Sequence, residues 1–161
     1  MDFEDRLQRA IERGQKSREQ DSQLQAIKTA TEEELRELHA TSRNDICDYL
    51  ETCLKKVAES FPGFIYKNVL GDEGWGSKIT RDDFLAVTSR QKENVFSRLE
   101  MVIKPYSKSH ILEVSSKATI RNKELYHRNH FQQLQQLELA SYKNLIDLWV
   151  LEFAEGYARN M

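Results

Sequence analysis

The stretch that decides the fold is residues 44–63, NDICDYLETCLKKVAESFPG. Its apolar residues recur at intervals of three or four, which predicts a helix with one buried face. They are Ile46, Leu50, Leu54, Val57 and Phe61. Pro62-Gly63 should end this helix, because proline cannot continue it and glycine is common just past a helix terminus. Since residues 15–61 contain neither Gly nor Pro, the helical segment should extend far toward the N-terminus.

The earlier part of this segment has a weaker apolar pattern. Phe3, Leu7, Ala10 and Ile11 begin it, but Gly14 and a polar run weaken these first turns, so residues before about 22 are expected to fray or to order only on contact with a partner. The pattern resumes as an interrupted stripe. This stripe consists of Leu24, Ile27, Leu35 and Leu38. It either packs back on the same domain or binds a second protomer or a partner's helix as a short coiled-coil arm.

Residues 41–45 lie between the two stripes and include good helix N-capping residues. The N-terminal segment is therefore predicted to be either one long helix or a kinked helix pair. We expect an amphipathic helical arm at residues 1–42 and a separate domain at residues 43–161.

After Pro62 the pattern becomes alternating, which predicts β-strands. The expected strands are 64–70, 84–88, 95–104, 111–121 and 124–131, with a loop at 71–76 and a hairpin turn at 122–123. Residues 111–121 alternate most strictly, so one face of the sheet should be in water. Residues 145–157 are apolar around most of a helix and should cover the other face. The predicted fold class is α+β, with an antiparallel sheet of four to five strands and a C-terminal helix packed on it.

Composition narrows the class of protein. The chain has 161 residues, of which 39% are hydrophobic and 31% charged, and this balance indicates a folded chain with much exposed helix. Cys47 and Cys53 lie on the predicted helix with side chains about 120° apart, so they cannot form a disulfide with each other. The acidic N-terminus and the lack of a long apolar stretch predict a cytoplasmic protein with no membrane partner.

The sequence contains none of the common catalytic or cofactor-binding motifs, including the nucleotide-binding glycine motifs, the serine-hydrolase elbow and the zinc-protease helix. We therefore predict no cofactor and favour a role other than catalysis. Glu124, His127 and His130 have a spacing that suits a divalent metal, because on a helix their side chains would share one side. On a strand they alternate between faces, so the expected strand at 124–131 makes this metal site a weak candidate.

The middle of the chain is basic, with nine Lys and Arg against four Glu in residues 90–128. The candidates for binding an anion or a nucleic acid are Arg98, Lys117, Arg121 and Arg128. A basic sheet face with aromatic residues can bind single strands. Here the aromatic residues are not interleaved with the basic ones, and the acids dilute the patch. A solvated face, or a dock for the protein's own acidic helix, is therefore favoured over nucleic acid as a partner.

Together these features predict a small cytoplasmic interaction or assembly protein that associates through its N-terminal helix, as a homodimer or with a helical protein partner. A first alternative is an enzyme or ligand-binding domain with an anionic small-molecule pocket near residues 121–130. This alternative requires Arg121, His127, Arg128 and His130 to converge in one cleft. A second alternative is single-stranded nucleic-acid binding through the basic sheet face, with strong salt dependence.

Overall fold

The computed structural model of the chain describes residues 2–30, 32–86 and 92–161, without the side chains of residues 24–30, 85, 86 and 92. The chain forms two compact units, an N-terminal unit (Met1–Glu37) and a C-terminal unit (Leu38–Met161). The limits of the arm and the domain at residues 42 and 43 stay a prediction.

The N-terminal segment forms two helices, α1 (Phe3–Ala30) and α2 (Glu32–Ser60). Residues 41–45, where the sequence suggested a kink, are helical throughout. The reason is tertiary packing. Ser42 is buried, and the Arg43 guanidinium carbon lies 3.4 Å from the centre of the Trp75 ring, so these side chains pack instead of capping a helix.

The end of α2 agrees with the prediction from Pro62-Gly63. Gly63 has a φ of 111°, a backbone conformation that residues with a Cβ rarely adopt. Arg81 Nη1 donates a hydrogen bond of 2.7 Å to the carbonyl oxygen of Pro62. This bond ties the chain after α2 to the sheet.

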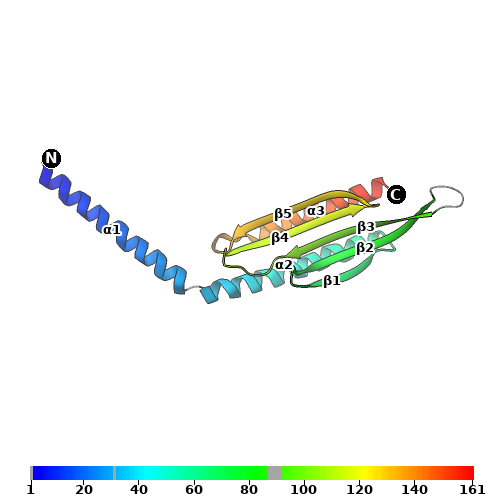
Figure 1. Ribbon diagram of the computed structural model, residues 1–161, viewed down its shortest axis with the longest axis horizontal. Coiled ribbons are helices and arrows are strands. Elements are labelled where there is room, and N and C mark those ends of the chain that lie inside the picture. The colour runs from blue at the N-terminus through cyan, green and yellow to red at the C-terminus, as the bar shows by residue number, and fades with distance from the viewer. Residues whose placement is uncertain (1, 31, 87–91) are drawn as a thin grey trace. The chain divides into compact units, whose positions relative to one another are not determined.

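The sheet is antiparallel and has the order β1-β2-β3-β4-β5, so every strand pairs with its neighbour in the sequence (Figure 1). The strands are β1 (Ile65–Gly71), β2 (Gly74–Ala86), β3 (Lys92–Ile103), β4 (Ile111–Ile120) and β5 (Lys123–Gln133). The predicted α+β fold with an antiparallel sheet is confirmed. The strand predicted at 84–88 is wrong in its start, since β2 begins at Gly74 inside the expected loop, where Gly71 pairs with Gly74. Residues 87 and 88 of that prediction lie outside the described residues.

The turn between β4 and β5 lies at Arg121-Asn122, one position earlier than predicted. Both residues have positive φ, 49° and 69°, as the two-residue type I′ hairpin turn requires. Asn122 also extends the hydrogen bonding of β3. Its Oδ1 accepts a hydrogen bond from the backbone N–H of Phe96, and its own N–H donates to the Phe96 carbonyl oxygen, both at 2.9 Å.

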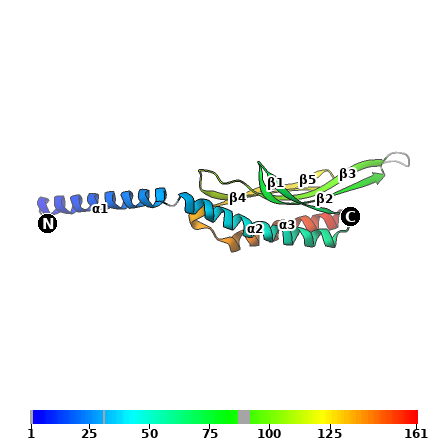
Figure 2. The same ribbon diagram turned by 90° about the horizontal axis from the view of Figure 1, so that it is seen from below.

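The C-terminal helix α3 (Leu139–Arg159) lies beside α2 on one face of the sheet, as Figure 2 shows. A short 3-10 turn, η1 (Leu134–Gln136), leads into it from β5. Tyr142 Oη donates to the Leu112 carbonyl oxygen at 2.6 Å, and Tyr126 Oη donates to the Trp149 carbonyl oxygen at 3.0 Å. The predicted packing of the C-terminal helix on the sheet is therefore confirmed.

The core lies between this face of the sheet and the two helices. It contains Ile46, Leu50 and Leu54 from α2, Ile79, Leu99, Met101, Leu112, Val114 and Ala118 from the sheet, and Tyr142, Ile146, Phe153 and Tyr157 from α3. The alternation predicted for residues 111–121 agrees with this burial, since Leu112, Val114 and Ala118 face the core. Of the described helices, none has a segment long and apolar enough to cross a bilayer.

Candidate functional site

The first candidate surface is an apolar stripe on α1. Phe3, Leu7 and Ile11 are 74%, 47% and 45% exposed, and their four-residue spacing places them along one side of the helix. We call these three residues the α1 stripe. An isolated helix is only marginally stable in water, because most helical stability in proteins comes from packing of an apolar face. Burial of the α1 stripe against another surface would therefore stabilise α1.

The residues predicted for partner binding are placed differently from one another. The side chains of Leu24 and Ile27 lie outside the described residues. On α2, Leu35 is buried and Leu38 is 39% exposed. The sequence did not predict the α1 stripe as a partner-binding surface. Gly14 and the polar residues after it separate the stripe from Leu24 and make its apolar pattern weak.

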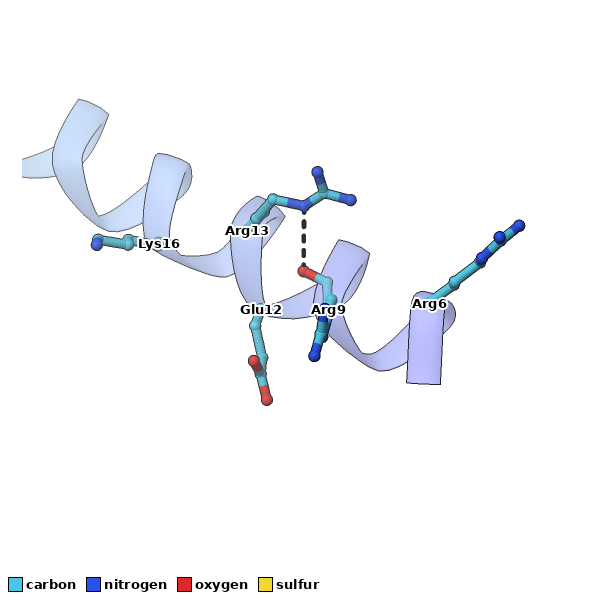
Figure 3. A pocket seen from close by; sticks show the side chains of 5 residues that line it. All are labelled: Arg6, Arg9, Glu12, Arg13 and Lys16. Carbon is cyan, nitrogen blue, oxygen red and sulfur yellow. Dashed lines mark hydrogen bonds between the residues drawn. The ribbon is translucent and has the colours of Figure 1, made fainter. Parts of the chain in front are cut away.

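The same part of α1 also carries a group of basic side chains outside the α1 stripe. Arg6, Arg9, Arg13 and Lys16, which we call the basic flank, line an open hollow of about 590 Å³ together with Glu12 (Figure 3). Figure 3 shows these side chains pointing outward from the helix in several directions, while Arg13 Nε donates to the Arg9 carbonyl oxygen at 3.3 Å. The basic flank is thus an exposed strip of charge and not an enclosure for a small molecule.

The second candidate surface is the face of the sheet opposite the helices. The pairing aligns one row of residues across all five strands, and this row consists of Lys67, Lys78, Glu100, Lys117 and His127. Part of it borders a hollow of about 470 Å³ with Val102 and Ser115 in its lining. The same lining contains Asp72, Glu73, Glu100, Lys104, Lys117 and His127. Because both signs of charge are present, the hollow does not favour an anionic ligand.

The four cations predicted to bind an anion do not form one patch. Arg98 and Lys117 lie on the open face, paired with Thr119 and Glu100. Arg121 lies in the β4–β5 turn. Arg128 lies on the helix side of the sheet, where Nη2 donates to Glu152 of α3 at 3.2 Å. The guanidinium of Arg128 also lies 4.6 Å from the centre of the Tyr126 ring.

The histidines of β5 are also separated. Pairing puts Glu124 opposite Thr119 and His127 opposite Lys117 on the open face, but His130 opposite Val114 on the helix side. There the His130 ring contacts Tyr142, with ring centres 5.1 Å apart. Arg121, His127, Arg128 and His130 therefore do not converge in one cleft. Within the described parts of the chain, no group of three or more His, Cys, Asp and Glu is arranged to hold a metal.

A third feature is a cluster on one side of α2 that the sequence prediction missed. His39, Arg43 and Cys47 follow one another at four-residue spacing, which was the available signal. Arg43 lines a hollow of about 350 Å³ together with Asp72, Trp75 and Tyr106. Cys47 Sγ donates to the Trp75 carbonyl oxygen at 3.4 Å, and burial raises the pKa of the thiol to about 11. Cys47 is therefore protonated at neutral pH and a poor nucleophile.

His39 is the most buried member of this cluster. It is 1% exposed, its ring centre lies 5.7 Å from that of Tyr106, and its Nε2 has no hydrogen-bond partner among the described residues. Burial lowers the pKa of His39 and the nearby Arg43 lowers it further, against a backbone hydrogen bond with Lys104 that raises it. The neutral imidazole is therefore the form that the fold accommodates.

We expect His39 to make the protein less stable as the pH falls below about 6.5. Because its pKa is lower in the folded state, the unfolded chain binds the proton first, so stability is complete above this pH and decreases through the window below it. Thermal unfolding should show that Tm decreases between pH 8 and pH 5, and that this decrease is about 2–4 °C smaller in His39→Gln than in wild type. His127→Gln, at an exposed position on β5, is the control. An equal pH dependence in wild type and His39→Gln would contradict the expectation.

Comparison of the chain with protein-family models, with curated proteins and with solved structures finds no match. Its function is therefore argued from the surfaces described above.

Proposed function

We propose that the protein is a small cytoplasmic interaction or assembly protein that associates through α1. The observation that carries this proposal is the exposure of Phe3, Leu7 and Ile11 along one side of the helix. Large apolar side chains at this spacing are the anchors by which an amphipathic helix docks into a groove or pairs with another helix. The partner is either a second copy of the chain or a helix of another protein.

The layout of the protein supports the same role. The C-terminal unit has its own core, so α1 is not needed to complete that core. Cys47 and Cys53 are free thiols in the structure, which suits a reducing compartment. The C-terminal unit would thus act as a folded body that carries a helix for recognition.

The proposal is tested by removing the α1 stripe from the full-length chain. The test variant carries Leu7→Ser and Ile11→Ser, and the matched control carries Gln8→Ser and Gln15→Ser, two exposed polar positions beside the α1 stripe but not part of it. We expect light scattering, or affinity capture from an extract of the source cells, to show an associated chain with wild type and control. The test variant should lose that chain, because serine removes the apolar area that drives docking.

Both outcomes are informative for the proposed function. Wild type and both double variants could all be monomers and capture the same proteins from the extract. That result would show that the protein does not associate through α1. Circular dichroism of all three chains shows whether the C-terminal unit is intact, so loss of binding is not confused with unfolding.

A further inference from the structure

We infer that the partner of α1 presents an acidic amphipathic helix and is not a second copy of this chain. This inference rests on the proposed function, since it concerns what covers the α1 stripe. Its basis is the uneven charge on the two sides of that stripe. At 100° per residue, Arg6 and Arg13 border the stripe on one side, whereas Glu4, Gln8 and Gln15 lie on the other.

The basic side is accessible to a partner. Arg6, Arg9, Arg13 and Lys16 are all exposed, and Figure 3 shows them extending away from the helix backbone. Arg9 and Lys16 lie about 160° and 180° around the helix from Leu7, on the face opposite the stripe. A helix docked on the α1 stripe would therefore place its own flanking residues beside arginines on one side only. Opposite charges in such flanking positions determine which helices pair.

A second copy of α1 does not satisfy this charge pattern. A twofold interface uses the same patch on both chains. In an antiparallel pair, the side bearing Arg6 and Arg13 would face the same arginines of the other copy. In a parallel pair with Phe3, Leu7, Ala10 and Gly14 in the seam, Arg13 would face Arg18, and Arg6 would face Ile11. Both arrangements oppose like charges, which disfavours the pair.

An anionic membrane surface fits less well than an acidic helix. Residues 2–23 contain six acidic and five basic residues. They are Asp2, Glu4, Asp5, Glu12, Glu19 and Asp21 against Arg6, Arg9, Arg13, Lys16 and Arg18. Helices that lie in a bilayer surface are rich in Lys and Arg over their polar face, and both sides of the apolar face meet the headgroups. A docked helix can instead carry its acids on the one flank that lies beside Arg6 and Arg13 and uncharged residues on the other flank.

The test uses the full-length protein and three synthetic amphipathic peptides with one leucine stripe, flanked by Glu, Gln or Lys. Fluorescence anisotropy should show the Glu peptide binding tightest and the Lys peptide roughly tenfold or more weaker, since two or three exposed charge pairs each change affinity by a few-fold at most. Added salt should reduce the affinity for the Glu peptide. Arg6→Gln with Arg13→Gln should lower that affinity about fivefold. Lys16→Gln, further from the stripe, is the control and should change it little.

The outcomes separate this inference from the proposed function. Equal affinity for all three peptides, lost with Leu7→Ser and Ile11→Ser, would overturn the inference and leave the proposed function standing. A dimer that the same double variant converts to a monomer would do likewise. Binding to vesicles of phosphatidylcholine with phosphatidylserine as the minor lipid, with no peptide bound, would overturn both. A monomer that binds no peptide and no vesicle would also overturn both.

Discussion

Gly76→Ala should strongly destabilise the C-terminal unit. Gly76 is buried in β2 and pairs with Val102 of β3. A Cβ at this position would overlap the carbonyl oxygen of Met101 and lie 2.7 Å from the Cα of Val102. Both are backbone atoms of a central strand, so neither can rotate away as a side chain would.

The expected loss exceeds about 3 kcal/mol in the free energy of unfolding, since overpacking that moves the backbone costs more than a simple rotamer change. Gly71→Ala is the matched control, because its Cβ would meet nothing within 4 Å. We expect that control to change the free energy of unfolding by no more than about 0.5 kcal/mol. Urea unfolding followed by circular dichroism measures both. Equal stability of the two variants would show that β2 and β3 do not approach at Gly76 as described.

Phe153→Ala should give the second large effect. Phe153 is fully buried on α3, with its ring centre 6.0 Å from that of Phe64 and 6.2 Å from that of Tyr157. Tyr157 in turn contacts Phe61 at 4.9 Å, so one aromatic cluster joins the end of α2, the start of β1 and α3. Truncation removes buried apolar area and leaves a cavity, which costs about 3–5 kcal/mol for a buried Phe.

Leu151→Ala on the same helix is the control, since Leu151 is 63% exposed. Its free energy of unfolding should change by about 0.5 kcal/mol or less. The two variants should have the same dependence of stability on urea concentration, because the surface exposed on unfolding is nearly unchanged. If Phe153→Ala were as stable as Leu151→Ala, the packing of α3 on the aromatic cluster would be wrong.

The fold was predictable where one face of an element is buried and the other is wet. Alternation in β3 and β4 follows directly from that one-sided burial, and the helix that ends before Pro62 shows its core face at helical spacing. β2 was predicted too short because the run from Ser77 to Asp83 mixes charged and apolar residues. Its length comes from hydrogen bonding to strands on both sides, which a local pattern does not record.

The functional surfaces were less predictable because they depend on distant parts of the chain. Arg128 was grouped with Arg98 and Lys117, but its pairing with Ser116 of β4 places it on the helix side of the sheet, where it binds Glu152 of α3. The contact between Arg43 and Trp75 joins α2 to a strand that the sequence pattern did not define at that position. In both cases the side chain contacts a residue that is distant in the sequence. Sequence periodicity alone does not show where that residue lies.

The neighbour-to-neighbour order of the sheet has a consequence for how the chain folds. Because each strand pairs with the next in the sequence, the hairpins can form in the order of synthesis at a small entropic cost of loop closure. The contacts between α2 and α3 are different, since the hydrogen bond between Tyr49 and Asp147 spans most of the C-terminal unit. α2 is synthesised before the sheet and can cover only part of its apolar side, so the rest stays in water until α3 docks, and this last step removes the remaining apolar surface that favours aggregation.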